Sequence, residues 1–215
     1  MDTATLLRWV ATHEPGKKEE AFASLTTGDS HYPALLRSLG IVGEMPLTFW
    51  ALSLLVQYFP ALLQRDANQA IPLVMACLVR GDGPVCDRAA WALSIMGEPA
   101  LDALVLNIQT TPDTADTVRY IGALRSNSSL YAAAGQVMAL LAAKLDSPCE
   151  EVQFWALVVL MDIGPLRPWF DKRLKESDFE QIYDRLLTVA KRLAPQKQFD
   201  FALTYIELLE KRLAK

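Results

Sequence analysis

The chain has 215 residues, of which 52% are hydrophobic and 21% charged, and its formal net charge at pH 7 is −4. This composition is too apolar for an intrinsically disordered chain. Residues 1–108 carry seven basic and eleven acidic side chains, whereas residues 166–215 carry eleven basic and eight acidic ones. We interpret the mildly basic C-terminal part as a solvated helical face, because it is too weakly charged to indicate a phosphate-binding surface.

The first 45 residues predict three short helices, over 3–12, 17–26 and 32–39, which are joined by turns rich in glycine, proline and aspartate. No apolar run precedes His13, and the second residue is acidic. We therefore predict no secretory signal and expect a cytoplasmic location.

The segment Met45–Gln64 has no charged residue and is long enough to cross a bilayer. Three residues interrupt its apolar character, namely Ser53, Gln57 and Pro60, and no basic cluster flanks either end. We therefore predict no membrane span.

A phrase typical of one helix occurs twice in the middle of the chain. Each copy opens with a proline, reaches Trp-Ala-Leu seven residues later and closes on glycine and proline: the first runs from Pro84 through Trp91 to Gly97, the second from Pro148 through Trp155 to Gly164. Weaker copies centre on positions 50 and 122, so the spacings are 41, 31 and 33 residues. Such spacings are typical of one helix pair per repeat in an α-solenoid, and we predict that the tryptophans are equivalent packing anchors.

A second helix is predicted after each anchor, over 71–79, 100–108, 130–145 and 166–175. The inward stripes expected for the second and third of these helices are Leu101, Leu104, Val105 and Ile108, then Ala134, Met138, Leu141 and Leu145. The leftover faces are those that a solenoid generally offers to a protein partner. The predicted partner-binding residues are therefore Asp102, Leu106, Gln109, Gln136, Leu140 and Lys144.

The sequence also predicts where the later helices begin. Ser147, Pro148 and Glu150 match an N-cap, a first-turn proline and an acidic N3 residue, and Ser177 and Glu180 match a second capping box. The second box opens a helix running to about residue 194, and a last helix follows Pro195. The inward stripes expected for these two helices are Phe179, Ile182, Leu186, Val189 and Leu193, then Ala202, Ile206, Leu209 and Leu213. We predict that this pair caps the repeats.

The phrase from Arg88 to Gly97 resembles the core of the short HEAT-like repeats of phycobilin lyase subunits and bacterial scaffold proteins. Arg119 keeps the arginine three residues before the anchor position. The resemblance covers 84–165 well, extends to 46 and fades at both ends. It implies an all-α, armadillo-type fold, a right-handed α-α superhelix of about five helix pairs. We predict a single domain over 1–215, with irregular N-terminal helices over 1–45, repeats over 46–175 and a capping pair over 176–215.

Motifs for chemistry are sparse in this sequence. Cys77, Cys86 and Cys149 form no paired motif and are interpreted as reduced packing thiols. His13 and His31 are the two histidines, and we interpret Asp29-Ser30-His31 as a polar turn in preference to a catalytic triad. No zinc, nucleotide or redox motif occurs, so we predict no catalytic residue, no metal and no cofactor.

Two enzyme alternatives remain open. A HEAT-like alkylpurine DNA glycosylase would use an aromatic side chain beside a carboxylate, as in the pairs Asp87 with Trp91 and Trp155 with Asp162. Such an enzyme needs a basic surface, and residues 66–165 hold five basic side chains that the acids outnumber. A bilin lyase subunit would need arginines and aromatics in a cleft, for which Arg80, Arg119, Tyr120 and Tyr131 are available. The resemblance favours a non-catalytic scaffold or adaptor that binds a protein, and not nucleic acid, in a concave groove.

Overall fold

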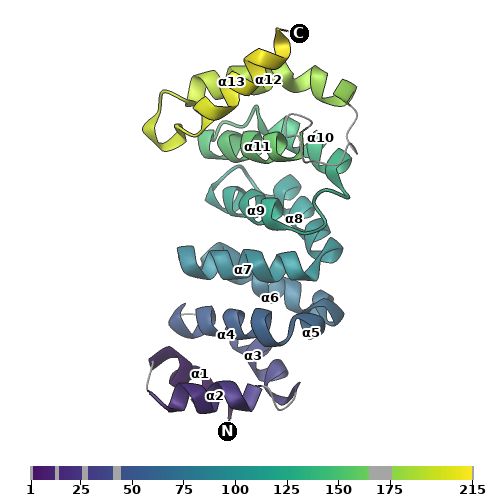
Figure 1. The fold of residues 1–215 in the computed structure, drawn as a ribbon. Helices are drawn as coiled ribbons and strands as arrows, with labels where there is room; N and C mark the ends of the chain where they lie inside the picture. The colour runs from purple at the N-terminus through teal and green to yellow at the C-terminus, as the bar shows by residue number, and fades with distance from the viewer. Residues whose placement is uncertain (1, 13–14, 26–28, 41–44, 165–175, 215) are drawn as a thin grey trace. The chain divides into compact units, whose positions relative to one another are not determined.

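The computed structural model describes residues 2–12, 15–25, 29–40, 45–164 and 176–214 (Figure 1). All regular secondary structure in these ranges is helical, which confirms the all-α prediction. The α-helices are α1 (Thr3–Thr12), α2 (Lys17–Leu25), α3 (Tyr32–Ser38), α4 (Met45–Tyr58), α5 (Pro60–Arg65), α6 (Ala67–Arg80), α7 (Gly83–Met96), α8 (Glu98–Thr110), α9 (Ala115–Ser126), α10 (Ala134–Lys144), α11 (Glu150–Ile163), α12 (Glu176–Leu193) and α13 (Ala202–Leu213). Short 3-10 helices, η1 (Asp29–His31) and η2 (Lys197–Phe199), precede α3 and α13.

The helices divide into two compact units. Unit 1 comprises Met1–Ala103 and Ser126–Ser128, and unit 2 comprises Leu104–Arg125 and Ser129–Lys215. One boundary falls within α8, and another falls at the end of α9. The organisation of 1–215 as a single repeat domain stays a prediction, and the helix predicted over 166–175 lies outside the described residues.

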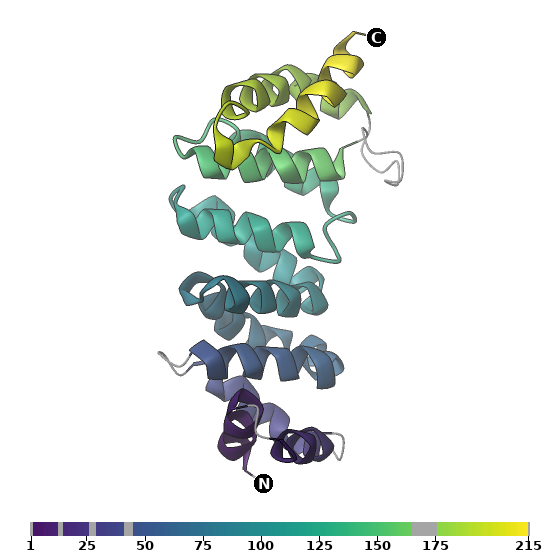
Figure 2. The same ribbon diagram turned by 60° about the vertical axis from the view of Figure 1, so that its left-hand side comes forward.

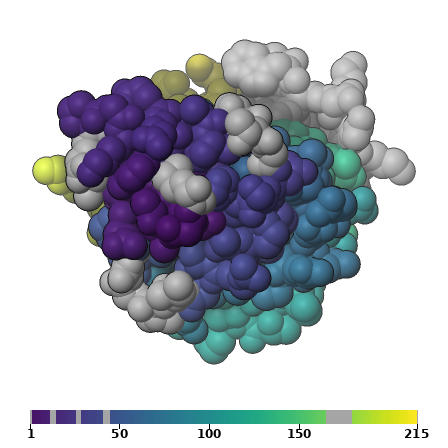
Figure 3. Space-filling model, turned by 90° about the horizontal axis from the view of Figure 1, so that it is seen from below, coloured from purple at the N-terminus to yellow at the C-terminus, as the bar shows by residue number. Residues whose placement is uncertain are grey.

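In unit 1, α7 packs against both α4 and α6, and α4 also packs against α1 and α3 (Figures 1 and 2). The helices α4 and α7 therefore lie side by side, with their outer faces adjacent. Helices α1 and α2 pack against each other and form part of the surface at the N-terminal end of this unit, as Figure 3 shows in purple. This arrangement places the outer faces of α2, α4 and α7 on one unit.

The repeated phrase is buried at its leucine, two residues after the predicted anchor. The leucines of the four copies have no exposed surface, and they are Leu52, Leu93, Leu124 and Leu157. Trp91, by contrast, is 48% exposed. The core stripe of α7 passes through Ala89 and Leu93, so Trp91 points to the other side of the helix. The prediction that Trp91 is a packing anchor is therefore wrong. The Ala-Leu pair that follows the anchor position is the part of each copy that is buried in the core.

The predicted start and stop of α7 are confirmed. The Asp82 carboxylate accepts a hydrogen bond from the Val85 amide at 3.1 Å, and Pro84 stands in the first turn. Gly97 ends the helix with φ of 67°, a left-handed conformation that suits glycine. The buried Asn127 amide donates to the carbonyls of Leu93 and Gly97 at 3.2 and 3.1 Å, and so provides a donor for the Leu93 carbonyl, which the end of α7 leaves open.

The start of α11 differs from the prediction. The helix begins at Glu150, and Cys149 is its N-cap without a side-chain cap hydrogen bond. Ser147 is not the N-cap, because its hydroxyl accepts from the Cys149 amide at 3.1 Å and so closes a turn before the helix. At the other end, a Cβ on Gly164 would lie 2.8 Å from the Phe179 ring, which explains the glycine by close packing.

The two C-terminal helices of unit 2 pack against each other and against α11. All five residues of the inward stripe predicted for α12 are buried. For α13 the prediction is only half right: Ala202 and Leu209 are buried, but Leu213 is 43% exposed. Tyr205 is 1% exposed and takes the inward place expected of Ile206, because the buried stripe advances by three and then four residues.

In the part of the chain that the structure describes, no helix combines the length and apolar character needed to cross a membrane. The charge-free segment forms α4 and the start of α5, which separate at Phe59.

Candidate functional site

Two cations and four aromatic rings form a continuous row across the outer faces of α2, α4 and α7 in unit 1. We call this surface the cation–aromatic row. In spatial order its members are Phe22, Lys18, Trp50, Phe49, Arg88 and Trp91.

Arg88 connects α4 to α7. Its guanidinium carbon lies 5.3 Å from the ring centroid of Phe49 on α4 and 5.1 Å from that of Trp91 on its own helix. Both distances lie within the range at which a cation is attracted to the face of a ring. Arg88 thereby bridges two rings of neighbouring helices.

Lys18 connects α2 to α4 in the same manner. Its ammonium lies 5.8 Å from the centroid of Phe22 on α2 and 5.4 Å from that of Trp50 on α4. The rings of Phe49 and Trp50 join the two halves of the row, with centroids 5.3 Å apart in an edge-to-face arrangement. The row is therefore continuous from Phe22 to Trp91.

The row combines exposed ring surface with positive charge. Trp91 is 48% exposed, and the other five members are half-buried. Among the described residues, neither Arg88 nor Lys18 forms an ion pair with a carboxylate. A ring face occupies one side of a guanidinium and leaves its N–H edges able to donate, so this surface can bind apolar groups and hydrogen-bond acceptors together.

Unit 2 has the same phrase without the row. Arg119, which stands where Arg88 stands in its own phrase, pairs with Asp116 at 3.7 Å. Trp155 packs edge-to-face on Phe154, with centroids 6.0 Å apart, and a valine occupies the place of the arginine three residues before it. The row is thus a property of unit 1 and not of the repeat phrase.

The residues predicted to bind a partner differ in accessibility. Asp102, Leu106 and Gln109 lie along one side of α8, and all are exposed, Leu106 by 57%. On α10, Gln136 is exposed and Leu140 is half-buried. Their role in binding stays a prediction.

Lys144, the last of the predicted partner-binding residues, is engaged within the fold. Its ammonium donates to Asp113 Oδ1 at 2.5 Å, and the two side chains are only 14% and 17% exposed. A partner that used Lys144 would have to break this ion pair. The sequence pattern predicted Lys144 on the outer face but contained no sign of its acidic neighbour Asp113.

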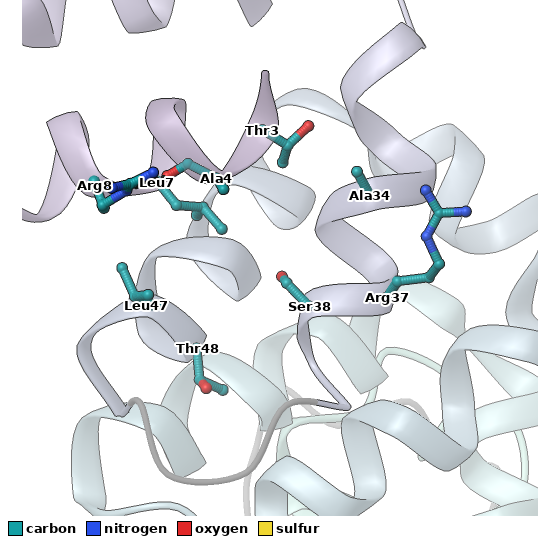
Figure 4. A pocket seen from close by; sticks show the side chains of 9 residues that line it. All are labelled: Thr3, Ala4, Leu7, Arg8, Ala34, Arg37, Ser38, Leu47 and Thr48. Carbon is teal, nitrogen blue, oxygen red and sulfur yellow. Dashed lines mark hydrogen bonds between the residues drawn. The ribbon is translucent and has the colours of Figure 1, made fainter. Parts of the chain in front are cut away.

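A cavity of about 520 Å³ lies between α1, α3 and α4 in unit 1 (Figure 4). Its lining comprises Thr3, Ala4, Leu7, Arg8, Ala34, Arg37, Ser38, Leu47 and Thr48. The hydroxyls of Ser38 and Thr3 are used inside the fold, since Ser38 donates to the Leu35 carbonyl and Thr3 Oγ1 lies 3.1 Å from His31 Nδ1. Figure 4 shows the Arg37 guanidinium extending away from the other labelled side chains. The lining thus offers an apolar space without a converging set of catalytic groups.

The residues weighed for enzyme chemistry have structural partners. The buried Asp162 carboxylate accepts from Arg125 Nε at 2.6 Å, and the His31 ring is buried against Thr3. No group of three or more histidine, cysteine, aspartate or glutamate side chains that could hold a metal ion occurs within the described ranges. Tyr120, considered for a bilin site, is 7% exposed.

The three cysteines are free thiols, as expected. Burial raises the pKa of the Cys77 thiol to about 11, so it stays protonated and unreactive at neutral pH. Cys77 and Cys86 both point at main-chain carbonyls, which are Leu39 O and Leu78 O. These contacts confirm a packing role for both residues.

Sequence reasoning missed Lys18, Phe22 and Phe49, although a signal was present. Lys18 and Phe22 are four residues apart on one helix, and Arg88 and Trp91 are three apart, spacings that bring side chains together. The contacts between helices, Lys18 with Trp50 and Arg88 with Phe49, depend on helix packing, which spacing along the chain does not reveal.

Comparisons with protein-family models, curated proteins and solved structures found no match to this chain.

Proposed function

We propose that this chain is a non-catalytic protein-interaction module whose partner binds to the cation–aromatic row. The single observation that carries the proposal is the exposed Trp91 ring held under the Arg88 guanidinium. Tryptophan and arginine are the residues most enriched among those that dominate the free energy of protein association. Trp91 is 48% exposed, whereas Leu93 of the same helix is completely buried, so the core of unit 1 does not account for the exposed part of the tryptophan ring.

The row is also organised before any partner arrives. Its side chains contact one another across α2, α4 and α7, whose packed cores hold the backbone. Binding therefore requires little further loss of side-chain freedom, which preserves affinity.

We also propose that the helices form HEAT-like repeats. The packing of α7 on both α4 and α6 supports this, because in such repeats equivalent helices lie side by side and the second helices cover one face. The burial of the four equivalent leucines supports one repeated unit. The right-handed superhelix of about five helix pairs, with a concave groove, stays a prediction.

The row is a better candidate surface than the outer sides of α8 and α10. Those two helices offer exposed polar residues and Leu106, but Lys144 is committed to Asp113. Isolated exposed leucines are common on protein surfaces, whereas a contiguous row of aromatic rings is not.

The proposal is tested by capturing partners from a lysate of the native cells with three immobilised proteins. These are the wild-type chain, Trp91→Ala and the matched control Trp155→Ala, which removes the same residue from the second phrase. The proposal predicts proteins that are retained by the wild type and by Trp155→Ala and lost with Trp91→Ala. Equal retention by all three proteins would contradict it.

A further inference from the structure

We infer that the partner segment recognised by the cation–aromatic row is an acidic peptide in which carboxylates alternate with apolar side chains. This inference rests on the proposed function and adds the chemistry of the partner. The row presents two cations, Lys18 and Arg88, set between four aromatic rings that belong to three helices.

The cations of the row differ from many others in this molecule. Elsewhere in the described residues, cations from both units pair with carboxylates of the same chain: Arg65 with Asp66, Arg119 with Asp116, Arg125 with Asp162, Lys144 with Asp113, Arg185 with Asp146, Lys191 with Glu210, and Lys211 with Glu207. Lys18 and Arg88 contact aromatic rings instead. A ring attracts a cation but accepts no conventional hydrogen bond from the N–H groups of that cation. A carboxylate of the partner can therefore accept the hydrogen bonds that the rings do not.

The geometry of Arg88 suits a carboxylate. Its guanidinium carbon lies over the rings of Phe49 and Trp91, and a guanidinium that contacts ring faces can still donate two parallel hydrogen bonds to one carboxylate. The exposed Trp91 ring lies next to this guanidinium. It would cover an apolar side chain next to the paired carboxylate.

The net charge of residues 1–108, which contain the row, favours a peptide with few charges over a nucleic acid. Residues 1–108 carry seven basic and eleven acidic side chains, so a phosphate on every nucleotide would be repelled by the net negative charge. A segment with a few carboxylates, each placed on Lys18 or Arg88, avoids most of that repulsion. Stacked bases would otherwise suit a row of aromatic rings, so an oligonucleotide is the necessary comparison.

The inference is tested with fluorescein-labelled peptides of one length, in which leucine and tryptophan alternate with glutamate, glutamine or lysine. Oligo-deoxythymidine is the fourth probe, and binding to the full chain is followed by fluorescence anisotropy. The inference predicts that the glutamate peptide binds about five- to tenfold more tightly than the glutamine peptide and that the lysine peptide and the oligonucleotide bind most weakly. In the variant Arg88→Gln the preference for glutamate over glutamine shrinks, while in the matched variant Arg119→Gln it is unchanged.

Two results would overturn the inference. One is equal affinity for the glutamate and glutamine peptides. The other is an oligonucleotide that binds more tightly than the glutamate peptide and whose binding is weakened in Arg88→Gln. Either result leaves the capture experiment with Trp91→Ala intact, so a failure of the partner chemistry is distinguishable from a failure of the proposed function. Circular dichroism of both arginine variants shows whether the helices are retained.

Discussion

The Arg88 guanidinium lies 5.1 Å from the ring centroid of Trp91. That ring is 48% exposed, although the repeated phrase predicted it as a packing anchor. Two residues further on, Leu93 is completely buried. The two residues therefore separate the roles of the phrase: the leucine stabilises the fold, and the tryptophan forms part of the surface.

This separation predicts different effects on stability. Leu93→Ala removes a buried side chain and leaves a cavity, so the free energy of unfolding should fall by about 3 kcal/mol. Trp91→Ala acts on an exposed ring and should lower it by no more than about 1 kcal/mol. Urea denaturation of both variants measures the difference. Equal losses would show that the ring is a packing anchor after all.

The second prediction concerns the ion pair between Arg125 and Asp162 in unit 2. Arg125→Ala removes the guanidinium that donates to a carboxylate only 8% exposed, so the free energy of unfolding should fall by about 2 kcal/mol. The control is Arg119→Ala, since that arginine forms a 3.7 Å pair with the exposed Asp116 and should contribute less than about 1 kcal/mol. If the free energies of unfolding of the two variants differ by less than the error of the denaturation curves, this account of Asp162 is contradicted.

The third prediction concerns alkaline pH and unit 1. Burial raises the pKa of Cys77 from 9.0 to about 11 and that of Tyr32 from 10.0 to about 12. Both groups are neutral when protonated, so their contribution to stability is complete below about pH 9 and is lost as the pH rises through about 11 to 12, because the unfolded chain releases these protons first.

Measurement of the free energy of unfolding between pH 8 and about pH 12 checks this third prediction. Cys77→Ala should flatten the lower part of the decline and Tyr32→Phe the upper part. Tyr32→Phe also removes the hydroxyl that donates to the Leu62 carbonyl at 3.1 Å, so the comparison is of slopes with pH and not of absolute stability. Wild-type slopes in both variants would show that other groups control the alkaline transition.

The fourth prediction separates the row from the outer faces of α8 and α10. If the row binds the partner, the double variant Asp102→Lys with Gln136→Lys should keep wild-type affinity, because both residues are exposed and neither belongs to the row. Isothermal titration of the captured partner gives the comparison. A loss of tenfold or more would favour the surface that sequence periodicity predicted.

Much of the fold was predictable from sequence because its signals are local. Proline at helix starts, glycine at Gly97 and apolar stripes at helical spacing gave the helices and most of their inward faces. The orientation of Trp91 was not predictable, since a large aromatic residue suits a core as well as a surface. The choice depends on which stripe of α7 meets α4 and α6, and helix packing decides that.

The candidate site was less predictable than the fold. Arg88 and Trp91 share a helix, but Phe49 and Trp50 approach Arg88 and Lys18 only because α4 packs against its neighbours. In the same way, the ion pair of Lys144 with Asp113, 31 residues away, has no local signal in the sequence.

The affinity of a captured partner for Trp91→Ala, set beside its affinity for Trp155→Ala, tests the central claim most directly. The account predicts a loss of at least tenfold for Trp91→Ala and unchanged affinity for Trp155→Ala, with both variants retaining wild-type helical circular dichroism. Wild-type affinity in Trp91→Ala would contradict the claim that the exposed tryptophan and its arginine form the binding surface.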